Sequence, residues 1–570
     1  MISPQFEKVM SRLLALGVPA VSMFLITGSV TDPVNVTKFL ILGAVGTSAL
    51  ALVIFRGNKL IWSNYKTQSL VVLSFVVFSL SAVLFSDAPF TQNLYGVYGR
   101  NTGLLTYLFL AALAIAALTL SQVTSFNKLM LGLFATGVVN VLYCTWAVFF
   151  GDFIQWSNPY GNILGLFGNP NFIGAFLGIW ISSTFGYFAF SKITIVRKAL
   201  VLGLLLLGAY AVYKSHAVQG VVVTVAGILV VGFLYLRSRT QGNLLIGIYS
   251  LAVATVGLFA IFGALQKGPL TSLVYKTSVS LRGAYWNAGI NMGMEHPLTG
   301  VGMDAYGDWY RPSRSIVAAT TTPGPNTVTN SAHNVPLDLL SYGGFPLFIT
   351  YLAVIGIGVL AILTGIKQTR KYDPLFAGLT VAWIGYQVQS IISINQIGLA
   401  VWGWVLTGAL ASYVRFMKVN NKSEDVNVSV APSKKQARRK NESIVSNELI
   451  AGLGLVAGLI FAAPPIASDS AWASASQSGN FVEVQKALEP SYLHPETTFK
   501  YLNVIETLER SQLHEQAHDY ALAALRFNPH NYDLWYALYA IKNSTEAEKA
   551  KALQKLKSLD PHNPDVTNNR

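Results

Sequence analysis

The chain has 570 residues, of which 52% are hydrophobic and only 12% are charged. A soluble globular protein averages about 25% charged residues, so the composition excludes an ordinary soluble enzyme and predicts an all-α, polytopic membrane helix bundle. The net charge of +14 would by itself suggest a nucleic-acid partner. We expect none, because the basic residues lie in short turns between apolar segments, where membrane orientation accounts for them. The single cysteine, Cys144, excludes a disulfide framework.

A helix needs about 20 mostly apolar residues to cross a bilayer, and on that basis we predict about 12–13 spans. The first follows a polar N-terminus and lacks a small-residue cleavage site, so we take it as a helix and not as a removed signal peptide. The candidates lie near 13–30, 38–55, 69–85, 103–120, 128–150, 171–190, 199–213, 217–236, 243–263, 343–364, 374–392, 398–417 and 448–466. The pair 199–213 and 217–236 is the weakest, because the first is short and the second follows almost at once.

The positive-inside rule sets the predicted orientation. With the N-terminus in the cytoplasm, the inner loops are short and rich in lysine and arginine. The outer loops before the C-terminal tail then contain eight cations: Lys38, Arg100, Lys214, Lys267, Lys276, Arg282, Arg311 and Arg314. The longest outer loop runs from about residue 264 to 342.

We divide the chain into a membrane domain over 1–417, a basic cytoplasmic linker over 418–447, a last span over 448–466 and an extracytoplasmic tail over 467–570. Pro464-Pro465 is expected to end the last span. In the tail, alanines at 517, 521 and 524 share one helical face, and the turns Asn528-Pro529-His530-Asn531 and Asp560-Pro561-His562-Asn563-Pro564 follow. This pattern resembles tetratricopeptide repeats, which predicts a helical domain that binds a protein partner.

The residue with the clearest chemical potential is His333, in Ser331-Ala332-His333-Asn334 at the end of the long outer loop. An imidazole there can accept a proton near neutral pH. A surface or helix-capping histidine is the plain alternative.

Outer cations strengthen the case for a site. The candidates are Arg100, Lys214, His216, Arg282, Arg311 and Arg314. A single outer cation is usually explained by contact with lipid headgroups. Several on one face, beside a histidine, predict an anion site, because arginine forks suit phosphate oxygens.

Other kinds of site find little support. The outer carboxylates, among them Asp304 and Asp308, show no metal-ligand spacing, so we expect no metal and no cofactor. No Walker-type loop, GxSxG or HExxH occurs. Ionisable residues are nearly absent from the predicted spans, which disfavours an ion-coupled transporter.

Four segments resemble the O-antigen ligase and polymerase family. They are Tyr98-Gly99-Arg100-Asn101-Thr102-Gly103-Leu104-Leu105, Phe167-Gly168-Asn169-Pro170-Asn171-Phe172, the run Arg282…Trp286…His296-Pro297-Leu298-Thr299-Gly300-Val301-Gly302, and His333-Asn334 followed by Gly343-Gly344. Each motif alone is weak, but the four occur in the family's order and topological positions.

The resemblance implies a metal-independent, inverting glycosyl transfer on the outer face. The donor would be a glycan on undecaprenyl pyrophosphate, and the acceptor a hydroxyl on a lipid, a glycan or a protein. His333 matches the family's proposed general base and Arg282 its pyrophosphate-binding arginine. Arg100 is a less certain match, and Asn334, Trp286 and Asn169 are supporting residues. Many relatives have Ser-Arg before the eighth helix, where this chain has Lys214-Ser215-His216.

Three functions remain open from the sequence. The first is an O-antigen ligase. The second is a polymerase or a protein O-oligosaccharyltransferase of the same superfamily, and the tail would suit a protein acceptor. The third is a membrane transporter or a scaffold that recruits partners through its tail.

Overall fold

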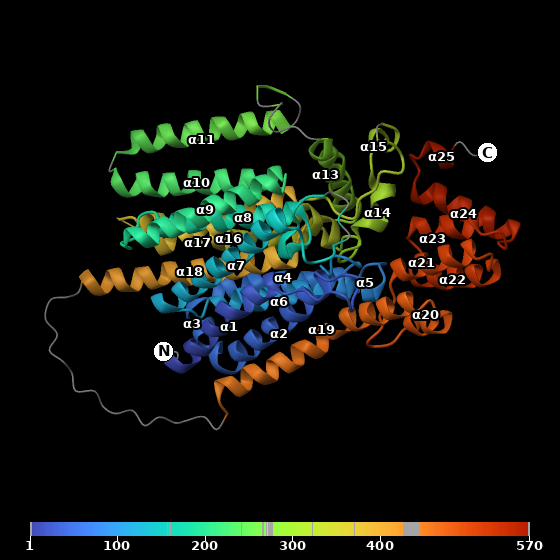
Figure 1. Ribbon diagram of the computed structural model, residues 1–570, viewed down its shortest axis with the longest axis horizontal. Coiled ribbons are helices and arrows are strands. Elements are labelled where there is room, and N and C mark those ends of the chain that lie inside the picture. The colour runs from blue at the N-terminus through green and yellow to red at the C-terminus, as the bar shows by residue number, and fades with distance from the viewer. Residues whose placement is uncertain are drawn as a thin grey trace.

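The computed structural model describes residues 3–156, 158, 161–240, 242–264, 267–269, 271, 277–321, 323–369, 371–425 and 445–567. Every regular element in these ranges is a helix (Figure 1). Nine of the described helices are long and apolar enough to cross a membrane. The predicted fold class, an all-α polytopic membrane bundle, is confirmed, and the chain is a multi-pass membrane protein.

The helices fall into three groups. The bundle contains α1 (Pro4–Met23), α2 (Asn35–Leu52), η1 (Val53–Gly57), α3 (Asn58–Asn64), α4 (Lys66–Leu84), α6 (Leu104–Ala117), α7 (Val123–Phe150), α8 (Pro170–Phe188), α9 (Ile195–Lys214), α10 (Val218–Arg239), α11 (Asn243–Ala264), α16 (Val335–Gln368), α17 (Pro374–Ile392), α18 (Ile397–Asp425) and α19 (Asn447–Ser478). The connecting segments contain α5 (Phe90–Tyr95), η2 (Gly165–Phe167), α13 (Thr277–Glu295), α14 (Tyr306–Ser313) and α15 (Ile316–Thr320). The tail contains α20 (Phe481–Leu488), α21 (Thr498–Arg510), α22 (His514–Phe527), α23 (Tyr532–Ala540), α24 (Glu546–Leu559) and α25 (Pro564–Thr567). The doubtful pair of spans is therefore two helices, α9 and α10.

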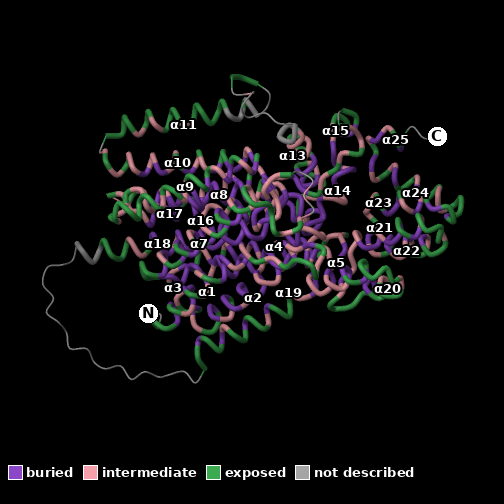
Figure 2. Tube along the Cα trace, viewed as in Figure 1, coloured by how far each residue is buried: buried purple, intermediate pink, exposed green. Residues whose placement is uncertain are grey.

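The centre of the bundle is α18, which packs against α6, α16 and α17. The most apolar part of α18 is 94% buried, whereas that of α9 is only 17% buried. Figure 2 shows the same contrast, with α11 exposed along most of its length at the edge of the bundle. A helix that is apolar but exposed on this scale faces lipid in a membrane protein.

The last span packs tightly against the second helix. A Cβ atom on Gly458 of α19 would lie 2.2 Å from the carbonyl oxygen of Gly43 on α2. Small residues allow two helix backbones to approach this closely, which is a common basis of helix association in lipid. The contact fixes α19, and with it the start of the tail, to the N-terminal part of the bundle.

Pro464-Pro465, predicted to end the last span, do not end the helix, because α19 continues through both prolines to Ser478. Pro464 has no N–H to give to the carbonyl of Ile460 four residues earlier. The hydroxyl of Tyr492 in the tail donates to that carbonyl instead. A tail side chain thus replaces the missing helix hydrogen bond, and the boundary between span and tail lies inside one continuous helix.

The predicted linker is also shorter than expected at its start. Residues 418–425 are the last part of α18. Residues 426–444, which contain most of its basic residues, lie outside the described part of the chain.

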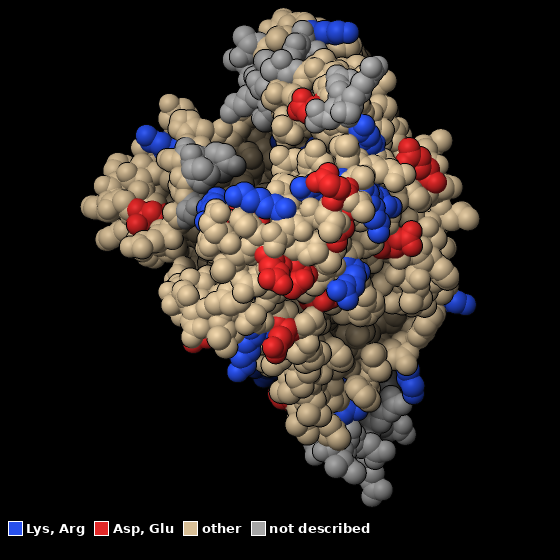
Figure 3. All heavy atoms as spheres, turned by 90° about the vertical axis from the view of Figure 1, so that its right-hand side faces the viewer, with Lys and Arg blue, Asp and Glu red and all other residues tan. Residues whose placement is uncertain are grey.

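The tail lies at the opposite end of the bundle from the N-terminus (Figure 1). Its helices α21 to α24 each pack on the next, and Ala517, Ala521 and Ala524 are fully buried in its core. Seen from the tail end, charged side chains of both signs gather over the tail, while the flanks are mostly uncharged (Figure 3). Alanines on the contact face agree with the helical domain predicted for this region.

Candidate functional site

His333 lies in the short segment just before α16, with a left-handed backbone (φ +54°). Its own N–H donates to the hydroxyl of Ser331 over 2.9 Å, and its Nδ1 lies 3.2 Å from the carbonyl oxygen of Ser331. Because a carbonyl oxygen only accepts, Nδ1 must carry the proton. Nε2 is then the atom with the free lone pair, and it has no hydrogen-bond partner within the described ranges.

The environment of His333 favours the neutral ring. Burial is the main cause that lowers its pKa to about 4, against the contact with the Ser331 carbonyl, which raises it. Arg282 and Arg100 add to the lowering. The charges of both guanidinium groups therefore act against protonation of the imidazole.

A buried carboxylate holds the backbone on which His333 sits. Asp338, in the first turn of α16, accepts hydrogen bonds from the Ser331 hydroxyl at 2.8 and 3.0 Å and from the Ala332 amide at 2.7 Å. Asn334 caps α16 by accepting from the Leu337 amide. The segment is thus fixed at both ends, which explains how the left-handed conformation of His333 is maintained.

Arg100 belongs to a buried network that joins the loop over about residues 86–102, which we call the first outer loop, to the long one. Its guanidinium lies 3.2 Å from Asp304 and donates to the Tyr342 hydroxyl at 3.1 Å. The Tyr342 hydroxyl in turn donates to Oδ1 of Asp304 at 3.0 Å, the same oxygen that faces Arg100. Arg100 also donates to the Asn330 backbone. Arg100 therefore has a charge partner before any ligand binds.

Gly96 makes that network possible. It has φ +87°, and a Cβ there would lie 2.7 Å from Asp304 Oδ2 and 2.4 Å from the Thr102 amide nitrogen. Oδ2 of Asp304 occupies the space next to Gly96. It accepts hydrogen bonds from the Val97 amide at 2.9 Å and from the Thr102 hydroxyl at 3.0 Å. Any other residue would push the loop away from Asp304.

Arg282 differs from Arg100 because no carboxylate pairs with it in the described part of the chain. Burial lowers its pKa, so its charge is held at a cost, and its Nε has no hydrogen-bond partner among the described residues. Three residues on, the Tyr285 ring lies 5.5 Å from the His333 ring. Trp286 follows, and its indole Nε1 also lacks a partner in those ranges.

Arg311 and Arg314 lie against the tail. Arg314 donates to both carboxylate oxygens of Asp560 at 2.7 Å, and Arg311 donates to Asp560 at 2.9 Å. The side chains of Arg314 and Asp560 are fully buried. The guanidinium of Arg311 also lies 4.0 Å from the centre of the Tyr532 ring. These two arginines join the long loop to the tail, and the contacts that they make are structural.

The neighbouring turn residues complete this tail interface, which we define as Asp308, Trp309, Arg311 and Arg314 of α14 with Asn528, His530, Asn531 and Asp560 of the tail. Asn531 and Asn528 donate to Asp308 at 2.8 and 3.2 Å. The rings of Trp309 and His530 stack with their centres 5.0 Å apart. Both Asn-Pro and Asp-Pro turns seen in the sequence therefore contact the chain's own outer loop.

The remaining predicted residues occupy helix ends. Lys214 lies over the Tyr210 ring at 5.7 Å, and the His216 ring is 6.2 Å from that of Tyr213. Asn169 caps α8 by accepting from the Asn171 amide at 2.8 Å. Of the predicted cations, Arg100 and Arg282 are the two that the structure brings to His333.

Sequence reasoning named Asp304 only as an outer carboxylate and missed Asp338, Ser331 and Tyr342. Their signal was weak, because an aspartate five residues after His333 looks like an ordinary first-turn residue of α16. No group of three His, Cys, Asp or Glu side chains that could hold a metal occurs within the described ranges. The absence of a metal from the reaction stays a prediction.

Most of the site lies in a segment that matches a family model. No curated protein matches the chain. The O-antigen ligase family model matches residues 202–352, which run from α9 to the middle of α16 and include Arg282, Trp286, His333 and Asn334. The match agrees with the resemblance to the O-antigen ligase family drawn from the sequence.

Proposed function

We propose that the chain transfers a glycan from an undecaprenyl-pyrophosphate carrier to an acceptor hydroxyl on the outer face of the membrane. The observation that carries the proposal is the state of His333. Its Nδ1 is held by the Ser331 carbonyl at 3.2 Å, its pKa is lowered to about 4, and Nε2 is left to accept a proton. A general base must be unprotonated at the working pH, and the lowered pKa favours the neutral ring there.

In the proposed reaction, Nε2 of His333 takes the proton of the acceptor hydroxyl as its oxygen attacks the anomeric carbon of the donor sugar. The bond from that carbon to the pyrophosphate oxygen breaks, with inversion at the carbon. Lipid pyrophosphate leaves with increased negative charge. Arg282, which has no carboxylate partner in the described ranges, is the group best suited to stabilise it.

Arg100 takes a different part in this proposal. Because it is paired with Asp304, Arg100 is proposed to orient the outer loops, and it makes a minor contribution to the lowered pKa of His333. Lys214 and His216 stand at the outer end of α9 and are proposed to meet the carrier's headgroup as it approaches from the bilayer.

The proposed orientation has the N-terminus in the cytoplasm and the tail outside. The separation of the N-terminus and the tail at opposite ends of the bundle supports it (Figure 1). The acceptor is a lipid, a glycan or a protein. A polymerase or a protein O-oligosaccharyltransferase would use the same base and leaving group, and product size and linkage distinguish these enzymes from a ligase.

The test uses purified full-length protein with an undecaprenyl-pyrophosphate-linked glycan, and follows donor consumption. His333→Asn keeps a residue that tolerates a left-handed backbone but removes the base, and His333→Ala removes the ring. We expect transfer to fall by about 10²–10⁴-fold in both, with normal membrane insertion.

The matched control is His296→Gln. His296 is also in the long outer loop, but its ring packs 4.8 Å from that of Trp309. It should keep donor consumption near the wild-type rate. Unchanged consumption in both His333 variants, or solute flux without any glycan product, contradicts the proposed function.

A further inference from the structure

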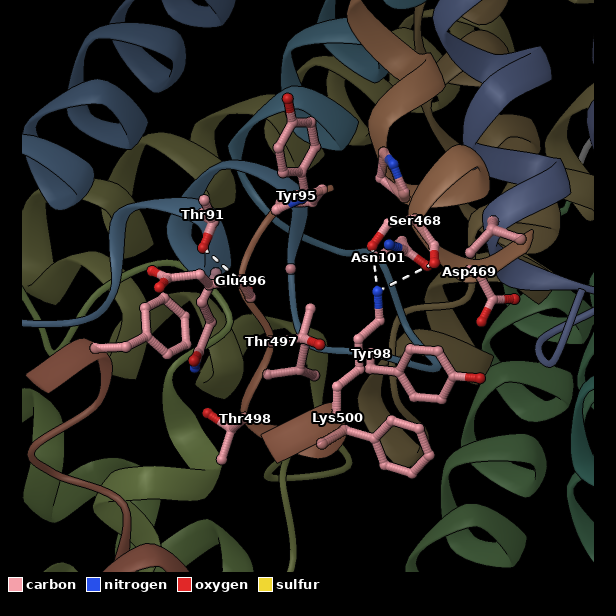
Figure 4. Close-up of a pocket in the computed structure, with 18 residues that line it drawn as sticks. Thr91, Tyr95, Tyr98, Asn101, Ser468, Asp469, Glu496, Thr497, Thr498 and Lys500 are labelled. Carbon is pink, nitrogen blue, oxygen red and sulfur yellow. Dashed lines mark hydrogen bonds between the residues drawn. The ribbon is translucent and has the colours of Figure 1, made fainter. Parts of the chain in front are cut away.

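A cavity lies between the first outer loop, α19 and the tail (Figure 4). Its volume is about 190 Å³, and it includes no residue of the His333 segment. Its lining contains Tyr98, Asn101, Asp469, Thr497, Phe499 and Lys500. It is therefore formed by three parts of the chain that are far apart in sequence.

Three buried polar atoms of residues that line this cavity lack a hydrogen-bond partner among the described residues, and one of them is Oδ1 of Asp469. Asn101 is 4% exposed, and neither its Oδ1 nor the Thr497 hydroxyl has a hydrogen-bond partner among the described residues. Buried polar groups are nearly always paired, so three unpaired ones around one cavity point to a ligand or to ordered water. Figure 4 shows Asn101 and Thr497 at the cavity wall.

The backbone of Asn101 shows that its position is built in. Asn101 has φ +53°, which asparagine tolerates better than most residues. Its carbonyl accepts from the Thr106 hydroxyl at 2.6 Å, and its amide donates to the Val97 carbonyl at 3.1 Å. The loop is fixed on both sides while the side-chain oxygen is left unpaired.

The charges in the cavity do not suit an anion. Lys500 is buried, which lowers its pKa to about 8, and its ammonium donates to the carbonyl and hydroxyl of Ser468. Asp469 and Glu496 place two carboxyl groups on the same lining. A phosphate would meet more negative than positive charge, so a neutral ligand is favoured.

The lining combines hydroxyls, amides and carboxylates with aromatic surface. The Tyr98 and Phe499 rings stack with their centres 4.3 Å apart and their planes 3° apart. A pyranose has several hydroxyls for the first kind of group and an apolar ring face for the second. Few other neutral molecules of this size need both.

The first outer loop contributes residues both to this cavity and to the network around Arg100 and His333. Arg100 and Thr102 contact Asp304, whereas Tyr98 and Asn101 line the cavity. A sugar held in the cavity would therefore contact the same loop that contacts the network near His333.

We propose that the cavity between the first outer loop and the tail is a subsite for one pyranose unit of a glycan, recognised by Asn101 and Thr497. The proposal rests on the proposed function for the identity of the glycan as a substrate, but sugar binding can be measured without transfer. The unit belongs to the donor chain or to a glycan acceptor, which share the same chemistry.

The binding test uses saturation-transfer NMR and thermal shift on the full-length protein in detergent. The probes are methyl glucoside, methyl galactoside, methyl mannoside, rhamnose and N-acetylglucosamine. We expect at least one sugar to bind, and Thr497→Val and Asn101→Gly each to weaken it by about tenfold, the loss of one hydrogen bond. His333→Asn should bind as the wild type does, so failure of catalysis does not affect this result.

The matched control is Thr507→Val on the same tail helix, whose hydroxyl donates to the Asn503 carbonyl outside the cavity. It should leave sugar binding unchanged. Without sugar, Thr497→Val should unfold at the same or a higher temperature, because it removes an unpaired buried hydroxyl. Absence of binding by every sugar, as expected for a cavity that holds only water, overturns the proposal, and so does equal binding by wild type and both cavity variants.

Steady-state transfer distinguishes the two sources of the sugar. If the subsite holds the donor chain, Thr497→Val raises KM for the lipid-linked donor by about tenfold with little change in kcat. If it holds a glycan acceptor, the same rise appears in the acceptor's KM. Normal KM values for both substrates, together with undiminished sugar binding, overturn the subsite.

Discussion

The outer loops contain two pairs of arginines that differ in whether a carboxylate balances their charge. Arg311 and Arg314 share Asp560 of the tail, with nitrogen-to-oxygen distances of 2.7 to 2.9 Å. Arg282 and Arg100 lie near His333, and of these only Arg100 has a carboxylate partner. In sequence the four look equivalent. Compensation by a carboxylate, and not position on the outer face, separates arginines that join parts of the fold from one that is available to an anion.

The largest effect is expected from breaking the tail interface. Asp560→Asn leaves two buried guanidinium groups without their carboxylate, and removing one partner of a buried pair costs about 3–5 kcal/mol. Thermal unfolding and limited proteolysis of the tail measure the loss. The control Asp519→Asn changes a side chain that is 77% exposed and should shift the midpoint little. Equal midpoints for both variants would show that Asp560 does not hold the tail.

Arg282→Ala tests the other pair and should act on chemistry. Removing one group that stabilises a leaving anion typically costs about 10²–10³-fold in rate. Stability should stay the same or rise, because Arg282 is partly buried without a carboxylate partner in the described ranges. Donor consumption and thermal unfolding are measured together. The exposed Arg510→Ala, 77% exposed, is the control, and a destabilised but active Arg282→Ala would reverse the assignment.

The pH profile gives a smaller and more specific effect. Because burial holds the pKa of His333 near 4, transfer should be flat from about pH 5 to 8 and fall about tenfold per unit below pH 4. Arg282 lowers that pKa, so residual transfer by Arg282→Ala should begin to fall at a higher pH. Arg314→Ala should not move the profile.

The same shift affects stability, with a definite sign. The folded pKa of His333 lies below its unfolded value, so its contribution is complete above about pH 6.5 and is lost as the pH falls toward 4. Unfolding midpoints of wild type and His333→Asn should therefore converge through this window. A loss of transfer centred near pH 6.5 would show that the fold lowers the pKa of His333 less than described.

The smallest effect should come from His530→Ala, which removes the ring stacked 5.0 Å from Trp309. Aromatic pairs of this kind contribute about 0.5–1.5 kcal/mol. Thermal unfolding should show a minor loss with normal transfer. A loss as large as that of Asp560→Asn would mean that the stack, and not the ion pair, holds the tail.

The sequence was sufficient for the helical fold class, and it singled out His333, Arg282 and Arg100 as candidates on one face without showing which of them meet. Apolar length predicts a span because a bilayer leaves no other way to satisfy the backbone, and the family motifs mark the outer loops. Site prediction failed to anticipate the partners of the cations. Arg100 and Asp304 are separated by about two hundred residues, and Arg311 and Asp560 by 249.

The tail turns illustrate why. Asn528-Pro529-His530-Asn531 was correctly taken as a break between helices, since α22 ends at Phe527 and α23 begins at Tyr532. Nothing in the turn indicates that its amides donate to Asp308. Such contacts depend on how two folded parts meet. The continuation of α19 through Pro464-Pro465 was not anticipated for the same reason, because the compensating hydroxyl belongs to Tyr492.

One feature of α16 divides the helix between two environments. Gly343 and Gly344 leave helical geometry, Gly344 with φ +65°, and a Cβ there would lie 2.4 Å from the Pro297 carbonyl oxygen. The amides of Val301, Gly302 and Phe345 join the break to the long loop. The predicted span, 343–364, starts at this break.

The residues before the glycines, among them Asp338 and Tyr342, belong to the network around His333 and Arg100. The residues after the glycines belong to the membrane span. We expect a polar substitution before the break to disturb the His333 segment, and a polar substitution of a lipid-facing residue after it to disturb membrane insertion. The two glycines let one helix accumulate changes for substrate and changes for membrane thickness independently.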